Sequence, residues 1–147
     1  MKHFISLKYL SSGQIQDILE LAACMKSKPQ DSKNTLAGKS IGLLFEKSSL
    51  RTKTAFYLGA LQLGANAIYY SPDEIKLGKR ESIPDVARTL SGYLDAVVLR
   101  TFSHNTILEF AKLSHIPIAN GLSDLLHPSQ ALADIMTINE FKGDLKK

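Results

Sequence analysis

Short runs that are almost entirely apolar alternate with helical patterns along this chain of 147 residues. Strands that are apolar at nearly every position are typical of a parallel sheet, because helices cover both of its faces. Strands are expected at 41–45, 67–70, 96–99 and 116–119, and helices after Ser11 or Ser12, at 55–63, 82–92, from 105 or 106 to 114, and at 128–141. The alternation predicts one α/β domain, a parallel sheet in three αβα layers.

The segment SSLRTKT at 48–54 joins the first expected strand to the helix that follows it. Hydroxyl groups, a guanidinium and an ammonium therefore lie where helix N–H groups lack partners and the macrodipole favours an anion. This combination is typical of a phosphate site. The plainer alternative is that Ser48 or Ser49 caps the helix while Arg51 and Lys53 point into solvent.

Two later segments carry polar residues just after expected strands, LRTFSH at 99–104 and HPSQALAD at 127–134. The carboxyl ends of parallel strands share one edge of the sheet, and ligands bind there near a switch in strand order. We therefore expect residues 49–52, Arg100 and residues 127–130 to converge on that edge.

Each of the later residues also has an alternative without a ligand. Arg100 could form an ion pair with Asp95 or Glu81, His127 could simply end a loop, and Gln130 could be a surface residue of a helix.

The chain has a net charge of +4 and a pI near 9.2. Its cations are scattered among acids, without a continuous basic face, an aromatic-interleaved strand or a zinc spacing, which argues against nucleic acid as a partner. A basic balance equally suits a protein whose ligands are anionic metabolites.

Apolar runs of the length of a membrane helix are absent from the sequence, and its first residues lack the apolar stretch of a secretion signal. The single cysteine, Cys24, allows no internal disulfide and fits a reducing compartment. We expect it to be a buried thiol in the first helix. These features predict a cytoplasmic protein that does not bind membranes.

Four segments together resemble the motifs of the ornithine carbamoyltransferases, in their N-terminal, carbamoyl-phosphate-binding half. The segment at 45–54 is similar to F-E-K-x-S-T-R-T-R, and the segment at 88–102 to A-R-x-L…D-x-x-x-x-R-x-F. Residues 120–124 match N-G-L-S-D, and residues 127–130 match H-P-x-Q. The sister aspartate carbamoyltransferases share S-x-R-T and H-P-x-Q, whereas N-G-L-S-D favours the ornithine branch.

The resemblance covers nearly the whole chain, and it implies a binding site for carbamoyl phosphate. Its residues would be Ser49, Leu50, Arg51, Thr52, Arg100, His127 and Gln130. The catalytic residues among them would be Arg51, Thr52, Arg100 and His127. Neither a cofactor nor a metal is expected, because phosphate is already a good leaving group and the histidines show no ligand spacing.

Within that implied site, the chemistry of each group suggests its role. The hydroxyls of Ser49 and Thr52, the first-turn N–H groups and the two guanidinium groups would hold the phosphate. Thr52, Arg100 and His127 would share the carbonyl oxygen, whose charge grows in the transition state. The Gln130 amide would accept a hydrogen bond from the carbamoyl NH₂.

Two positions depart from the family pattern, Leu50 in place of Thr and Lys53 in place of Arg. Lysine keeps the charge but lacks the fork of donors that arginine offers. In the related trimers the loop at 71–82 reaches the neighbouring subunit, so Lys76 or Arg80 would be candidates to act there in trans.

Members of the family are longer, with a second domain that binds the amino acid. The resemblance therefore implies that 1–147 is the carbamoyl-phosphate-binding domain and that the helix at 128–141 leads toward the second domain. The complete enzyme would be a homotrimer that makes citrulline and phosphate from ornithine and carbamoyl phosphate, in arginine biosynthesis or the urea cycle. The chain alone would bind carbamoyl phosphate without turnover. Half of an aspartate-type enzyme and a natural non-catalytic binding module remain the alternatives.

Overall fold

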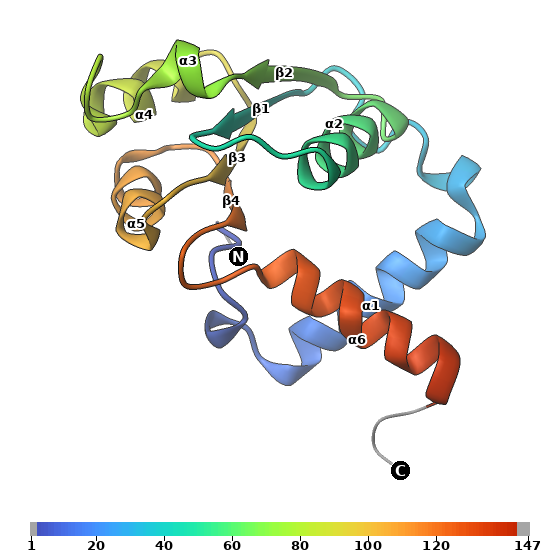
Figure 1. Ribbon diagram of the computed structural model, residues 1–147. Helices are drawn as coiled ribbons and strands as arrows, with labels where there is room; N and C mark the ends of the chain where they lie inside the picture. Colours follow the sequence, from blue (N-terminus) through green and yellow to red (C-terminus); the bar gives the residue numbers. More distant parts are fainter. Residues whose placement is uncertain (1–2, 144–147) are drawn as a thin grey trace.

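The computed structural model of the chain describes residues 3–143; the ends of the expected 1–147 domain, residues 1–2 and 144–147, lie outside the described residues. Within that range four parallel strands form a sheet in the order β2-β1-β3-β4 (Figure 1). The strands are β1 (Ser40–Phe45), β2 (Asn66–Tyr70), β3 (Ala96–Arg100) and β4 (Ile118–Leu122). The chain moves from β1 outward to β2 and then returns to β3 on the other side of β1. The strand order therefore switches between β1 and β3, where a ligand crevice is expected.

Helices lie on both faces of this sheet, which confirms the predicted α/β architecture (Figure 1). They are α1 (Ser12–Ser27), α2 (Arg51–Gln62), α3 (Pro72–Ile75), α4 (Ile83–Ser91), α5 (His104–Leu113) and α6 (Pro128–Lys142), with 3₁₀ turns at Leu7–Tyr9 and Pro29–Ser32. One buried cluster joins alternate strand residues, such as Leu44 and Leu99, to α4 and α5. The other joins the intervening residues, such as Leu43 and Val98, to α2. The period of two along each strand thus divides the core into two layers.

Three helix boundaries follow the local signals in the sequence. Ser11 caps α1 in a capping box, accepting from the Gln14 N–H while the Gln14 side chain accepts from the Ser11 N–H. Ser82 caps α4 by accepting from the Asp85 N–H at 3.3 Å. Gly64 follows the end of α2 with φ of +87°, as expected for a glycine just past a helix.

The expectation of a buried thiol in the first helix is wrong. Cys24 is exposed, because α1 only half-buries its apolar stripe and the cysteine lies one position away from Met25. α1 crosses α6 (Figure 1), where the Lys26 ammonium and the Glu140 carboxylate lie 2.8 Å apart. An exposed pair of this kind contributes at most about 1 kcal/mol.

β4 lies further along the chain than the run 116–119 predicts. Pro117 has no N–H to donate to a ladder, which delays the start of the strand. Phe4 then forms a parallel bridge beside β4, and its carbonyl oxygen accepts from the Asn120 N–H at 2.8 Å. This pairing carries the strand through an Asn-Gly pair that, by itself, is typical of a turn.

Two further elements differ from expectation. The short helix α3 lies inside the stretch 71–82, which we expected to be a loop, because Ser71 and Glu74 form a capping box around its first turn. α5 begins at His104 rather than at 105 or 106, since Ser103 is its N-cap residue.

Two glycines at α2 provide a matched test of backbone conformation. Replacing Gly64 by alanine should lower the free energy of unfolding by about 1–2 kcal/mol, because a left-handed residue with a Cβ is strained. The new Cβ would also lie 3.0 Å from the Lys33 carbonyl oxygen. Gly59, inside α2, has open space around the position of a Cβ. There Gly59→Ala should raise stability by about 0.5–1 kcal/mol. Urea denaturation followed by circular dichroism measures both, and equal effects of the two changes would contradict this account.

Candidate anion-binding site

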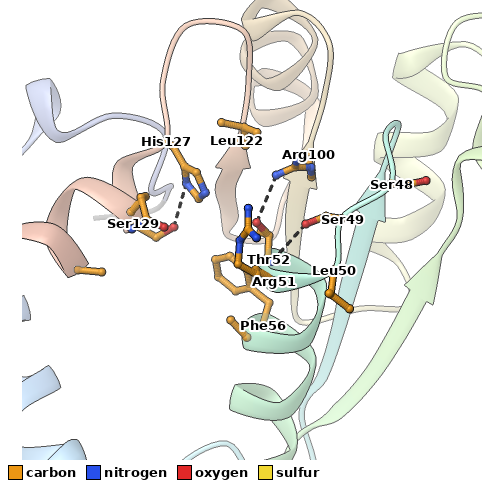
Figure 2. A pocket seen from close by; sticks show the side chains of 13 residues that line it. Ser48, Ser49, Leu50, Arg51, Thr52, Phe56, Arg100, Leu122, His127 and Ser129 are labelled. Carbon is orange, nitrogen blue, oxygen red and sulfur yellow. Dashed lines mark hydrogen bonds between the residues drawn. The ribbon is translucent and has the colours of Figure 1, made fainter.

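The carboxyl ends of β1 and β3 open into a cavity of about 630 Å³. Residues that come from three separated segments line it together: Ser49, Leu50, Arg51, Thr52, Arg100, His127 and Gln130. Figure 2 shows these segments meeting, with α2 on one side and the His127 segment opposite. The cavity therefore lies at the switch in strand order, where the topology of the sheet places a ligand crevice.

The first turn of α2 forms one wall of the cavity. Its N-cap residue is Leu50, which makes no side-chain capping bond and is 81% exposed. Ser49 Oγ instead accepts from the Thr52 N–H at 3.2 Å, so the capping role proposed for this serine is present. The positive end of a twelve-residue helix thus faces the cavity.

Arg100 is the last residue of β3 and is partly buried. Its Nη1 donates to Thr52 Oγ1 at 3.2 Å, and its buried Nε has no hydrogen-bond partner among residues 3–143. Burial lowers the pKa of the guanidinium from its ordinary value, although arginine keeps its charge at neutral pH. A buried donor without an acceptor costs about 1–3 kcal/mol.

The alternative that Arg100 serves a structural ion pair is wrong. Asp95 pairs with Lys39 instead, at 2.9 Å, and also accepts from the Ser40 N–H at 2.8 Å. These two hydrogen bonds lower the pKa of the Asp95 carboxyl, with the Lys39 side chain as the larger cause. In the described part of the chain the Arg100 guanidinium has no carboxylate within ion-pair distance.

His127 lies at the N-cap position of α6, across the cavity from α2 (Figure 2). Its Nδ1 lies 3.3 Å from Ser129 Oγ. Burial lowers the pKa of the imidazole below its ordinary 6.5, the positive charge of Arg100 lowers it further, and Asp134 acts in the opposite direction. The ring is therefore neutral near pH 7 and offers one donor and one acceptor nitrogen.

Arg51 and Gln130 complete the polar lining. The Arg51 side chain is exposed, and Figure 2 shows its guanidinium pointing toward the space between His127 and Arg100. Gln130 Nε2 donates to Asp134 Oδ1 at 2.8 Å, so the amide oxygen of Gln130 is left as an acceptor.

Three other cations considered at the sequence level lie outside the cavity lining. Lys53 Nζ lies 3.7 Å from the centroid of the Tyr69 ring, a cation–π contact that turns the ammonium away from the cavity. Lys76 ends α3 with left-handed backbone, at φ of 40°. Arg80 Nη1 donates to the Glu74 carbonyl oxygen at 3.4 Å. Action of Lys76 or Arg80 in a neighbouring subunit stays a prediction.

Sequence reasoning missed several residues of the lining, among them Phe56, Leu122 and Ser129. Ser129 lies inside the H-P-x-Q segment, so its place beside His127 had a signal in the sequence. Leu122 lies inside the N-G-L-S-D segment, but it was expected beyond the fourth strand, at 116–119, rather than at the end of β4. Its backbone φ of 151° is unusual for a residue with a side chain.

The described residues contain neither a metal-ligand cluster nor a membrane-spanning helix. No group of three or more His, Cys, Asp or Glu side chains between residues 3 and 143 could hold a metal ion. None of the described helices is both long and apolar enough to cross a membrane.

Comparison with known proteins identifies the family. The family model described as aspartate/ornithine carbamoyltransferase, carbamoyl-P binding domain, matches residues 2–140. Ornithine carbamoyltransferase from Listeria monocytogenes serotype 4a is 46% identical over 145 residues, which are 99% of this chain and 46% of that protein.

Solved structures agree with the sequence matches. Ornithine carbamoyltransferase from Pyrococcus furiosus has a TM-score of 0.93 at 38% identity, covering 97% of this chain and 46% of the other. Acetylornithine transcarbamylase complexed with acetylcitrulline has a TM-score of 0.87 at 30% identity, covering 99% of this chain and 50% of the other. The chain thus spans about half the length of these relatives. The resemblance read from the motifs is confirmed, and the chain belongs to the aspartate/ornithine carbamoyltransferase family, in which it matches the carbamoyl-phosphate-binding domain.

Proposed function

We propose that the cavity at the ends of β1 and β3 binds carbamoyl phosphate, and that the chain is the corresponding half of an ornithine carbamoyltransferase. The complete enzyme would transfer the carbamoyl group to ornithine, with citrulline and phosphate as products. The observation that carries this proposal is the meeting of two guanidinium groups with the N-terminal end of α2 at one cavity. No carboxylate lies within ion-pair distance of either guanidinium in the described part of the chain.

The phosphate of this ligand is a dianion, and the first turn of α2 suits it. Arg51 and Arg100 offer fork-shaped donors, and a hydrogen bond to a charged group is worth about 1.5–3 kcal/mol. The Arg100 Nε–H, which is buried and has no acceptor within residues 3–143, is among the donors available to the ligand. The helix macrodipole adds a smaller favourable term.

The carbonyl oxygen of the ligand would be polarised by Thr52, Arg100 and His127. We assign Ser129 as the donor to His127 Nδ1, which places the ring proton on Nε2 and makes that nitrogen a donor toward the cavity. A neutral donor of this kind stabilises the oxygen as its negative charge develops, and loss of one such donor typically costs about 10²–10³ in rate.

The attacking amine would be supplied by a part of the protein outside these 147 residues, toward which α6 leads. The relatives compared above carry ornithine and acetylornithine in their names at similar TM-scores, so the fold of this half does not select the amine. The name of the 46% identical relative favours ornithine over aspartate. Assembly as a homotrimer, a cytoplasmic location and a role in arginine metabolism are part of the same proposal.

The proposal can be tested by replacing Arg51 and, as a control, a neighbouring cation that does not line the cavity. Arg51→Ala should weaken carbamoyl phosphate binding to the 147-residue chain about 30-fold, about 2 kcal/mol, because charge-assisted hydrogen bonds are lost. Lys53→Ala removes the same charge two residues away but leaves the cavity unchanged, so we expect less than about a threefold change. Isothermal titration calorimetry measures both. Equal affinities of wild type and Arg51→Ala would refute the site.

An assay of citrulline formation on the same preparation distinguishes binding of carbamoyl phosphate from catalysis. With ornithine and carbamoyl phosphate, the 147-residue chain should form no measurable citrulline while still binding carbamoyl phosphate. Efficient citrulline formation would mean that the amine is bound by this half after all. The same assay with aspartate tests the aspartate-type alternative.

The electrostatic coupling across the cavity gives a further prediction. Because the positive charge of Arg100 lowers the pKa of His127, Arg100→Leu should raise that pKa relative to wild type. Arg88→Leu removes an exposed guanidinium from α4, on the face of the sheet opposite to α2, and should leave the His127 pKa where it is. Titration of the imidazole resonances by NMR provides the measurement, and an unchanged pKa in Arg100→Leu would show that the two groups are not coupled.

A further inference from the structure

We propose that Glu46 is a positioning residue that sets the direction of the Arg100 guanidinium in the cavity. The proposal rests on the proposed function to the extent that Arg100 binds the phosphate ligand. Glu46 is the first residue after β1 and does not line the cavity itself. Its effect on the ligand would be exerted entirely through the end of β3.

Glu46 contacts the main chain of β3 at two points around Arg100. Its N–H donates to the Arg100 carbonyl oxygen at 2.8 Å. Its Oε2 accepts from the Phe102 N–H at 3.0 Å. One residue thus holds the peptide groups on both sides of Thr101, just where β3 ends and its regular pairing with β1 stops.

The end of β3 is also held at Thr101, whose side chain is buried and whose N–H donates to the Leu122 carbonyl oxygen at 3.0 Å, but few polar contacts orient the arginine side chain itself. On the β4 side the register shifts between Leu99 and Arg100. The guanidinium has a single hydrogen bond, to Thr52 Oγ1 at 3.2 Å, and no ion pair within residues 3–143. Its direction therefore depends on the backbone at Arg100 and on the position of Thr52.

Glu46 binds the backbone on both sides of Thr101, and it also begins the loop that leads to α2 and Thr52. The two walls of the cavity are consequently tied together twice: by the Arg100–Thr52 hydrogen bond on the ligand side and by Glu46 behind it. Thr101 is buried at this end of the strand, whereas Phe102 beyond it is 63% exposed and contacts the Lys47 ammonium, which lies 5.0 Å from the ring centroid.

The choice of acceptor matters for the anion site. The Glu46 carboxylate binds a backbone N–H and forms no ion pair with an arginine or lysine in the described part of the chain. A carboxylate bound directly to the Arg100 guanidinium would compete with the phosphate, because the same donors would be occupied. Glu46 orients the arginine through the peptide backbone and leaves its charge available to a ligand.

The length of the side chain, rather than its charge, should therefore decide binding. Glu46→Gln keeps an oxygen acceptor at the same reach, whereas Glu46→Asp keeps the charge but is too short for the Phe102 N–H. We expect Glu46→Asp and Glu46→Ala to weaken binding of carbamoyl phosphate, and of inorganic phosphate, about tenfold, with Glu46→Gln within about threefold of wild type. Glu109→Ala, which removes an exposed carboxylate from α5, serves as the control and should bind like wild type.

The sign of the effect separates positioning from simple electrostatics. Removal of a negative charge near an anion site should by itself strengthen anion binding, so weakening by Glu46→Ala points to geometry. In an Arg100→Leu background Glu46→Ala should cause no further loss, because the two residues act through the same group. Tighter binding by Glu46→Ala, a Gln variant as weak as Asp, or additive losses with Arg100→Leu would overturn the proposal.

A measurement on the ligand-free chain tests this proposal independently of the proposed function. NMR relaxation of the Arg100 Nε–H should show greater motion in Glu46→Asp than in wild type and Glu46→Gln. If the wild-type chain bound neither carbamoyl phosphate nor phosphate, the proposed function would fail, while the Nε–H relaxation would still decide the role of Glu46. Unchanged relaxation of the Arg100 Nε–H in Glu46→Asp would refute the positioning role of Glu46. Should Glu46→Ala fail to fold, the Asp and Gln pair decides alone.

Discussion

The pairing of β1 with β3 is the constraint on which the rest of this structure depends. These two strands are neighbours in the sheet although β2 lies between them in the sequence, and their register places Phe45 opposite Arg100. The chain leaves β1 and β3 toward opposite edges of the sheet, so the loops that follow them diverge and leave a crevice. The first turn of α2 and the Arg100 side chain reach this crevice as a direct result of that register.

The same arrangement makes the crevice electrostatically costly. A partly buried guanidinium that has no carboxylate partner among the described residues and carries a buried Nε–H lowers stability, and it also disfavours a proton on His127. Positive groups held close together at low dielectric repel one another. The same charges and the same low dielectric attract an added dianion strongly. Burial is the larger cause of the lowered imidazole pKa, and the charge of Arg100, which lowers it further, also supports the affinity proposed for carbamoyl phosphate.

Local signals in the sequence were enough for three of the four strands and for helix ends that rest on neighbouring residues: Ser11 with Gln14, Ser82 with Asp85, Gly64 after α2. The lining of the cavity was predicted in part, from polar residues that follow the expected strands. Features that depend on a distant partner were missed. The shift of β4 needs Phe4, more than a hundred residues away, and the direction of Lys53 needs the Tyr69 ring. The Phe102 N–H that Glu46 binds is 56 residues away in sequence, which explains why motif reasoning gave no role to this glutamate.

The two departures from the family motif can be understood from where their side chains lie. Leu50 is the N-cap residue of α2, makes no side-chain capping bond and is largely exposed, so the backbone rather than the side chain contributes at this position. Lys53 contacts Tyr69, and the donor geometry that distinguishes arginine from lysine is not used there. Arg51 and Arg100, in contrast, offer forked donors to one small volume, and lysine would present a single point charge in place of each fork. Under the proposed function, change should therefore be tolerated better at 50 and 53 than at 51 or 100, because only the latter two offer planar guanidinium groups to the cavity.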